Sequence, residues 1–383
     1  MTAGPLAGLV VADFSRVLAA PYLTMLLGDL GADIIKVERP DTGDDTRAWG
    51  PPHHRGEATY NLAVNRNKRS VVLDLADQDD RAAAQRLAAR ADVLIENFRP
   101  GTMARLGLGE ESLRTRNPGL IYCSLSGFGT GPGAAMPGYD LLVQAMGGLM
   151  SVTGPGPGHP TKTGVALVDV LCGLHAGIGV LAALRHRDRT GHGQLVEVDL
   201  LSTLLSSMVN QAAAHTLTGV VPGIMGNRHP SIAPYEVFPA SDRPMVLAVG
   251  TDRQFRSLAA VLGLPGLAND ARFATNTARV AHADALAALL STSLSARTAE
   301  EWYKLLTPHG VPCGPVNDLA DAFQLAERLQ LSPRVEIDGR DLVANPIRLE
   351  ATPPTYRRPP PALGEHTEEV LHWLAAEPEE EHP

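Results

Sequence analysis

The sequence predicts an α/β protein with a doubly wound parallel sheet in its N-terminal half and a second, smaller α/β segment after residue 234. Short apolar runs alternate with helical segments from residue 8 onward, which is the pattern of βαβ crossovers. The chain has 383 residues, 44% hydrophobic and 20% charged, so it is long enough for two packed domains. A stretch rich in Gly and Pro, residues 219–234, separates the two patterns.

The first pattern predicts buried strands joined by helices. The strands are expected at 8–14, 32–38, 70–75, 91–97, 120–128 and 194–200. The helices are expected near 21–30, 79–90, 139–152, 169–186 and 201–218. Ligands bind beyond the carboxyl ends of such strands. The site is therefore expected around Ser15-Arg16, Glu38-Arg39, Asn97-Phe98 and Ser126-Gly127.

The second pattern is shorter. Strands are expected at 235–240 and 244–250, with helices near 252–262, 281–293 and 298–308. A Pro-rich segment, 353–361, and a short helix near 366–375 follow.

Composition and motifs exclude several classes of function. A net charge of −9 and a pI near 5.8 give no general attraction to nucleic acid or to an anionic membrane surface. The apolar stretch 171–184 is short and Gly-rich for a membrane span, so no membrane partner is expected. Cys123, Cys172 and Cys313 lie far apart without a CxxC spacing, which disfavours zinc and disulfides and favours a cytoplasmic setting.

Cofactor and hydrolase motifs are also missing. No GxGxxG follows the first strand, and neither GxSxG nor HExxH occurs. His53-His54 has no third ligand placed beside it, so no metal is predicted. A run of basic residues flanks the predicted strand ends and suits either a solvated loop or a phosphate-bearing ligand; it comprises Arg39, Arg47, Arg66, Lys68 and Arg69.

Asp169 is a lone acid inside the apolar run 164–173. An isolated carboxylate there must be hydrogen-bonded, neutralised by a raised pKa, or used in chemistry, because burying it unpaired costs several kcal/mol. Two interpretations follow from the residues alone. Asp169 is either a helix N-terminal acid satisfied by backbone amides, or a nucleophile.

Several ordered motifs resemble those of the class III coenzyme A transferase family. They are residues 14–21 (FSRVLAAP), 31–40 (GADIIKVERP), 67–70 (NKRS), 96–101 (ENFRPG), 126–129 (SGFG), 137–140 (PGYD), 190–200 and 310–317 (GVPCGPVN). The resemblance covers nearly the whole chain. It implies that Asp169, which follows Gly164 in a G-x-x-x-x-D context, is the catalytic residue.

The resemblance also implies an architecture. A large Rossmann-like, CoA-binding domain would comprise residues 1–205, with 335–383 returning to it. A linker, 206–230, would lead to a small α/β domain, 231–325, and a second linker, 326–334, would lead back. Two chains would form a homodimer of interlocked rings.

The implied substrates are an acyl-CoA and a carboxylic acid, with no permanently bound cofactor. The family match assigns CoA contacts to Leu18, Ala19, Arg39, Leu73, Asp74, Leu75, Asn97, Phe98, Arg105, Met136, Gly138 and Tyr139. Leu73 and Phe98 would sandwich the adenine, and Arg39 and Arg105 would meet phosphates. Oxyanions would be stabilised by backbone N–H groups near the start of the Asp169 helix. Candidate contacts to the substrate acid are Arg16, Arg47, Arg228 and His229.

Two other functions remain open on the sequence. The family includes α-methylacyl-CoA racemases, but their histidine falls at Tyr139, and tyrosine, with a pKa near 10, is a poor base at neutral pH. A non-catalytic CoA-binding protein is the other, and it has no need of a costly acid at position 169. A glutamine common in formyl-CoA transferases is Leu18 here, and no tetraglycine loop exists. Residues 225–235 look more like the succinyl-CoA:dicarboxylate branch, which puts oxalate in doubt as the acceptor.

Overall fold

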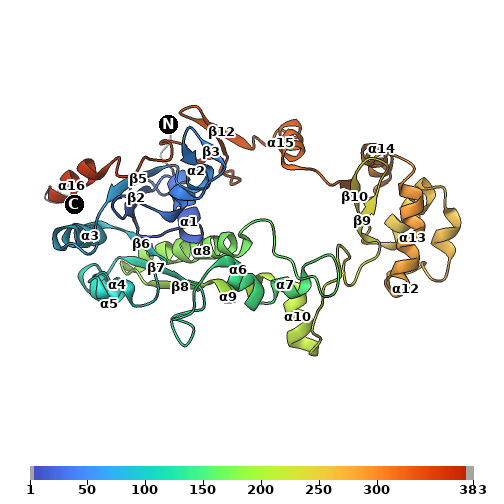
Figure 1. The fold of residues 1–383 in the computed structure, drawn as a ribbon, viewed down its shortest axis with the longest axis horizontal. Coiled ribbons are helices and arrows are strands. Elements are labelled where there is room, and N and C mark those ends of the chain that lie inside the picture. The colour runs from blue at the N-terminus through green and yellow to red at the C-terminus, as the bar shows by residue number, and fades with distance from the viewer. Residues whose placement is uncertain (1–3, 377–383) are drawn as a thin grey trace. The chain divides into compact units, whose positions relative to one another are not determined.

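A six-stranded parallel sheet organises the N-terminal half of the molecule (Figure 1). Its strands are β1 (Val10–Asp13), β2 (Asp33–Glu38), β5 (Lys68–Val72), β6 (Val93–Glu96), β7 (Ile121–Ser126) and β8 (Leu195–Asp199). Their order is β5-β2-β1-β6-β7-β8, and every neighbouring pair is parallel. Counted along the chain, this is the doubly wound 3-2-1-4-5-6 order, with its switch point between β1 and β6. The predicted α/β fold with a parallel sheet is confirmed.

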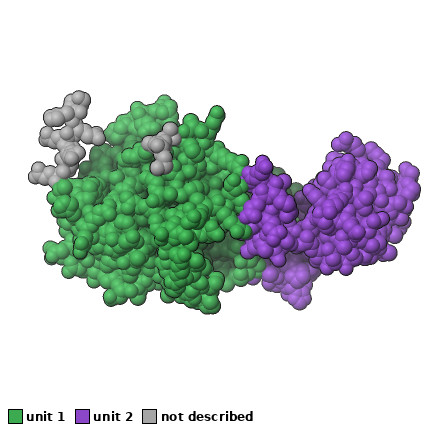
Figure 2. Space-filling view, turned by 90° about the horizontal axis from the view of Figure 1, so that it is seen from above, with its two compact units in different colours: residues 1–149, 162–221, 332–383 green, residues 150–161, 222–331 purple. Residues whose placement is uncertain are grey.

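The structure is a computed structural model that describes residues 4–376. It divides into two compact units (Figure 2). The first comprises residues up to 149, 162–221 and 332 onward, and the second comprises 150–161 and 222–331. The C-terminal part of the first unit includes α16 (Thr367–Ala375), which packs against β5 and α3 (Gln78–Arg90).

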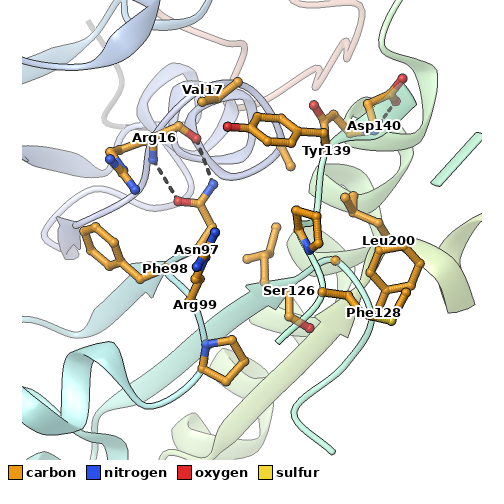
Figure 3. A pocket seen from close by; sticks show the side chains of 18 of the residues that line it. Arg16, Val17, Asn97, Phe98, Arg99, Ser126, Phe128, Tyr139, Asp140 and Leu200 are labelled. Carbon is orange, nitrogen blue, oxygen red and sulfur yellow. Dashed lines mark hydrogen bonds between the residues drawn. The ribbon is translucent and has the colours of Figure 1, made fainter. Parts of the chain in front are cut away.

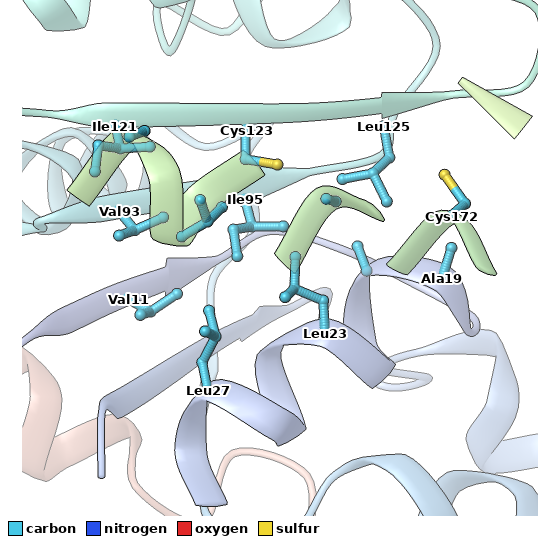
Figure 4. Close-up of a cluster of buried hydrophobic side chains, with 14 of the residues drawn as sticks. Val11, Ala19, Leu23, Leu27, Val93, Ile95, Ile121, Cys123, Leu125 and Cys172 are labelled. Atoms are coloured by element: carbon cyan, nitrogen blue, oxygen red, sulfur yellow. The ribbon is translucent and has the colours of Figure 1, made fainter. Parts of the chain in front are cut away.

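Helices cover both faces of the parallel sheet, and most of its strands are buried, except that the edge strand β8 is partly exposed. One face packs against α1 (Ala19–Asp29), α8 (Leu167–Thr190) and α9 (Leu200–Ser207), with Leu23 and Leu27 pointing at the strands (Figure 4). The other face packs against α3, α5 (Glu110–Arg116) and α16 through Leu87, Leu113 and Leu374. Burying each such leucine contributes about 1.5–3 kcal/mol.

Helices α1 and α8 approach each other closely because α8 carries a glycine at the contact. A Cβ on Gly173 would lie 2.4 Å from the backbone oxygen of Ala19. Only glycine therefore lets the two helices pack at this distance. This contact sets how closely α8 packs against α1.

The apolar segment 171–184 belongs to a longer helix than predicted. α8 has 24 residues with a mean hydropathy of 2.0 in its most apolar window, so its length and composition suit a membrane span, and the expectation that it is too short was wrong. Of that window 39% is buried inside the protein. Cys172, Ala176 and Val180 face the sheet, while Ile178 stays exposed. A core helix with one apolar face uncovered fits these observations.

The remaining elements of the first unit are short. They are η1 (Asp45–Ala48), β3 (His53–His54), β4 (Glu57–Ala58), α2 (Thr59–Val64), α4 (Thr102–Arg105), α6 (Asp140–Met146), α10 (Val209–Thr218), β12 (Arg334–Ile337) and β13 (Arg340–Val343). The single helix predicted over 139–152 is divided into α6 and α7 (Leu149–Val152) by Gly147 and Gly148, and Gly148 has φ 87°. The expected linker 206–230 contains α10, which clusters with the first unit.

The second unit holds a three-stranded antiparallel sheet in the order β11-β10-β9. Its elements are β9 (Tyr235–Pro239), β10 (Pro244–Ala248), α11 (Asp252–Val261), η2 (Pro265–Asn269), α12 (Asn276–Ala281), α13 (Ala283–Leu294), α14 (Ala299–Leu306), η3 (Thr307–His309), β11 (Cys313–Pro315) and α15 (Leu319–Arg328). Phe238, Phe255, Leu290 and Trp302 form its core.

Candidate active site

A pocket of about 260 Å³ opens at the carboxyl ends of β1, β6 and β7, at the switch point of the sheet. Figure 3 shows its lining side chains converging from separate loops. Residues from three of the four predicted strand ends line it, namely Arg16, Asn97-Phe98 and Ser126-Gly127. The pocket also contains most of the predicted site residues: Arg16, Leu18, Ala19, Asn97, Phe98, Met136, Gly138, Tyr139 and Asp169.

Asp169 enters the pocket from the third position of α8. Its side chain is half-buried, and no donor in the described part of the chain hydrogen-bonds to its carboxylate. Burial, and then the negative charge of Asp140, raise the pKa of Asp169 to about 7. Asp169 is therefore an unpartnered acid that is still about half ionised at neutral pH.

Asp140, and not Asp169, caps the start of α8. Its Oδ1 accepts hydrogen bonds from the backbone N–H groups of Val168 at 2.8 Å and Asp169 at 3.2 Å. Gln144 Nε2 donates to the other Asp140 oxygen at 2.5 Å. The interpretation of Asp169 as a helix-capping acid is therefore wrong, because a different carboxylate fills that role. The sequence did not single out Asp140, although it is the last residue of the PGYD motif.

The expected oxyanion donors at the start of α8 are already occupied. Val168 N–H and Asp169 N–H donate to Asp140, and Leu167 N–H donates to the Val165 oxygen at 2.8 Å. The next amide, Val170 N–H, donates to the Ala166 oxygen at 3.3 Å. The prediction that these amides stabilise an oxyanion was wrong for this conformation.

Two glycines place Tyr139 and Asp140 beside β7. A Cβ on Gly127 would lie 2.3 Å from the Gly138 Cα, and a Cβ on Gly138 would lie 2.7 Å from the Gly127 Cα. The two segments can cross at this point only because both residues lack side chains. Tyr139, 63% exposed, then lines the pocket, and Asp140 reaches α8 (Figure 3).

A second pocket, of about 250 Å³, lies beside the ends of β2 and β5. It contains the predicted residues Arg39, Leu73, Asp74 and Leu75. Arg16 and Phe98 line both pockets, and the Arg16 guanidinium carbon lies 5.0 Å from the centre of the Phe98 ring. These two side chains therefore mark the junction. Leu73 is only 1% exposed and packs in the core, so half-buried Leu75 offers more surface to a ligand.

Some predicted site residues line neither pocket. Arg47 forms an ion pair with Glu38 at 2.7 Å, and exposed Arg105 donates to the Thr102 hydroxyl at 3.0 Å. In the second unit, Arg228 lies between Asp284, at 2.8 Å, and Glu236, at 3.3 Å. The His229 ring packs on Tyr235, with 5.2 Å between ring centres.

The basic run between residues 39 and 69 does not form one anion site. Arg66 pairs with Asp29 at 2.7 Å, Arg69 pairs with Asp33, and Lys68 is fully buried beside Asp13 at 3.2 Å. Burial lowers the pKa of Lys68 to about 8, despite the opposing charge of Asp13. Of the five residues, only Arg39 lines either pocket.

A buried ion pair belongs to the wall of the second pocket. Lys36 Nζ is 2.9 Å from the Asp44 carboxylate, and both side chains are 1% exposed. Burial alone would raise the pKa of Asp44, but the Lys36 charge and the Thr46 amide lower it to about 2. No sequence pattern indicated this pair. Within the described residues, no group of three or more His, Cys, Asp or Glu side chains is arranged as a metal site.

Comparison with known proteins identifies the class. Residues 6–367 match the family model for CoA-transferase family III. The chain is 44% identical to the succinate–glutarate CoA-transferase of Agrobacterium fabrum, over 97% of this chain and 96% of that protein. It is 42% identical to the acetyl-CoA:oxalate CoA-transferase of Acetobacter aceti, over 93% and 92%. A crystal structure of a CAIB/BAIF family protein from Brucella suis superposes with a TM-score of 0.89 at 42% identity, covering 97% of this chain and 100% of that one. The protein belongs to CoA-transferase family III and is an enzyme of that class.

Proposed function

We propose that this enzyme moves CoA from a short acyl-CoA to a carboxylic acid, with Asp169 as the nucleophile. The observation that carries the proposal is an unpartnered, half-buried carboxylate at the switch-point pocket. A carboxylate kept only for structure would be satisfied by hydrogen bonds. In this chain Asp140 supplies the helix cap, which leaves Asp169 free to react.

The chemistry proceeds by acyl exchange. The Asp169 carboxylate attacks the thioester carbonyl, forming a mixed anhydride and releasing CoA thiolate. The thiolate attacks the aspartyl carbonyl, giving an aspartyl-CoA thioester and the free donor acid. The acceptor carboxylate then attacks this thioester, forming a second anhydride and releasing the thiolate again. Attack of the thiolate on the acceptor carbonyl yields the new acyl-CoA and restores Asp169. Each step exchanges activated acyl groups of similar energy, so no ATP is required.

We place CoA across the two pockets. The second pocket, with Leu75, Phe98 and the rim cation Arg39, suits an adenine ring and its phosphates. The first pocket holds Asp169 and suits the thioester end. Arg16 at the junction lies within reach of either part. The remaining CoA contacts that the family resemblance implies in these pockets belong to this arrangement: Leu18, Ala19, Leu73, Asp74, Asn97, Met136, Gly138 and Tyr139.

A dicarboxylic acid is the acceptor class that we propose. The Agrobacterium relative is named for succinate and glutarate, and the Acetobacter relative is named for oxalate. Oxalate therefore belongs in the test panel beside glutarate, although the chain lacks a tetraglycine loop. Arg228 and His229 stay predictions for a contact with a substrate carboxylate, and Arg228 would have to exchange Asp284 or Glu236 for it.

We further propose a homodimer that works in the cytoplasm. Helix α8 leaves apolar side chains uncovered in the single chain: Leu174 is 41% exposed, Ile178 68% and Leu181 43%. A second copy of the chain would remove this surface from water. All three cysteines are free thiols, in keeping with a reducing compartment.

Mass spectrometry tests the nucleophile. Protein incubated with succinyl-CoA should gain a CoA-sized adduct, and Asp169→Ala should lose both the adduct and transfer to glutarate by roughly 10³-fold or more. Asp169→Asn is the matched variant, because it keeps the side-chain shape. CoA binding without adduct or exchange would instead indicate a binding protein. Deuterium incorporation at the α-carbon of a branched acyl-CoA, without transfer, would indicate a racemase.

A further inference from the structure

The turn between β1 and α1 contains a strained residue at the first pocket. Val17 has a φ of 69°. A β-branched residue in this left-handed region is an outlier, because its side chain crowds its own backbone. Val17 lines the pocket beside Arg16 (Figure 3), and Leu18 lines it too. Such strain persists only where surrounding contacts over-determine the backbone.

The first part of the turn is held by side chains from the ends of neighbouring strands. Asp13 accepts a hydrogen bond from Ser15 N–H at 2.9 Å. Asn97 then brackets the next residue, since its Oδ1 accepts from Arg16 N–H at 2.9 Å and its Nδ2 donates to the Arg16 oxygen at 2.7 Å. The amide of Asn97 is therefore matched to both polar groups of one residue.

The buried Lys36–Asp44 pair holds the groups on either side of Arg16. Lys36 Nζ donates to the Ser15 oxygen at 2.8 Å. The Asp44 carboxylate accepts from Val17 N–H, at 3.3 Å to Oδ1 and 3.2 Å to Oδ2. Asp44 is therefore hydrogen-bonded to the strained residue itself. The ion pair with Lys36 fixes the orientation of the Asp44 carboxylate.

We propose that Asp44 is a positioning residue for the CoA-transfer reaction, holding Val17 in its left-handed conformation and so fixing the pocket wall formed by Arg16 to Leu18. The inference rests on the proposed function. Acyl transfer requires the thioester carbonyl and the nucleophile in near-attack geometry, and a small displacement of one wall is costly. Without Asp44, Val17 relaxes to negative φ and moves that wall away from the position it shares with Asp169.

A double-mutant cycle tests this coupling. Asp44→Asn leaves a single acceptor oxygen for Lys36, Thr46 and Val17 together, so in the wild-type background it should lower kcat about tenfold, with a smaller change in the KM for acyl-CoA. In a Val17→Gly background the same substitution should lower kcat less than about twofold, because glycine adopts positive φ without strain. Val17→Ala is the matched control, since it removes most of the side chain but keeps the preference for negative φ. There, Asp44→Asn should again cost about tenfold.

Equal losses of kcat from Asp44→Asn in all three backgrounds would overturn the proposal, as would an unchanged kcat in the wild-type background. A purely structural role would lower thermal stability without this pattern. If Asp44→Asn fails to fold, Asp44→Glu takes its place in the double-mutant cycle. Glutamate keeps a negative charge for Lys36 but displaces the carboxylate from Val17 N–H. An inactive wild-type enzyme would refute the proposed function alone. In that case, crystal structures of the Asp44 variants test the conformation of the turn. Val17 retained at positive φ in these variants would overturn the inference.

Discussion

At the scale of the residue, reactivity and stability conflict at Asp169. In the proposed mechanism its carboxylate must be ionised to attack a thioester, yet burial and Asp140 favour the neutral form and raise its pKa to about 7. The rate of transfer should therefore rise with pH up to about 7 and level off above it. The carboxyl that we propose as the nucleophile is therefore costly to keep charged in the folded protein.

Replacing Asp169 with Asn should stabilise the protein at alkaline pH. Because the folded-state pKa of about 7 lies above the ordinary aspartate pKa of 3.8, the native state holds the proton more tightly than the unfolded chain. Stability is therefore lost as the pH rises from the unfolded to the folded pKa, and the full cost remains above it. Asp169→Asn should raise the free energy of unfolding by roughly 1–3 kcal/mol at pH 8 and have almost no effect near pH 4. Urea titrations at both pH values measure this, and an equal effect at both would contradict it.

Asp140 should set the acidic limb of the pH–rate profile. Asp140→Asn removes the negative charge beside Asp169 but keeps an oxygen to cap α8, so the pKa of Asp169 should fall and the acidic limb should move to lower pH. Asp140→Ala is the control, since it also removes the cap and should cost about 1 kcal/mol of stability. Profiles of kcat/KM against pH give the readout. An acidic limb that stays in place in Asp140→Asn would show that the two carboxylates do not interact.

At the scale of the element, the contact between α1 and α8 connects the core to the site. α1 begins directly after the strained turn at Val17, and α8 carries Asp169 in its first turn. The two helices meet at Gly173, where a Cβ would lie 2.4 Å from the Ala19 oxygen. Packing between these helices therefore fixes how far the Asp169 side chain lies from the Arg16–Leu18 wall.

Gly173→Ala should consequently disturb both stability and catalysis. The added methyl group would clash with the α1 backbone at Ala19 and push α8 away from it. This should lower the free energy of unfolding by about 1–3 kcal/mol and should also lower kcat. Gly177→Ala is the matched control on the same helix, because its Cβ would meet only the end of the Leu23 side chain at 3.1 Å. There the gain in helix propensity, about 1 kcal/mol, should offset the crowding. Chemical denaturation and steady-state rates check both variants, and equal losses of stability would contradict the proposed close contact.

At the scale of the whole molecule, the sequence allowed the sheet to be predicted because its strands contain short apolar runs that alternate with helical segments. The sequence patterns did not reveal features that depend on contacts between residues far apart in the chain. Lys68 opens β5 as a charged residue that is nonetheless buried, and no local pattern reveals its partner Asp13, 55 positions away. Asp169 was identifiable as a lone acid. The role of Asp140 was not, because it depends on Gly127 and Gly138 crossing closely enough to bring α6 to the start of α8.

The proposed self-association of two chains depends on the exposed apolar face of α8. The apolar face of α8 is uncovered, and Ile178 at 68% exposure lies at its centre between Leu174 and Leu181. A charge there would have to be buried in the proposed dimer, so Ile178→Glu should weaken self-association at least about tenfold. Leu289→Glu is a control at an exposed leucine of the second unit, 43% exposed on α13. Sedimentation equilibrium across a concentration series measures both. If Ile178→Glu and the wild type share one dissociation constant, or if the wild type is monomeric throughout, the α8 face is not the surface that joins two chains.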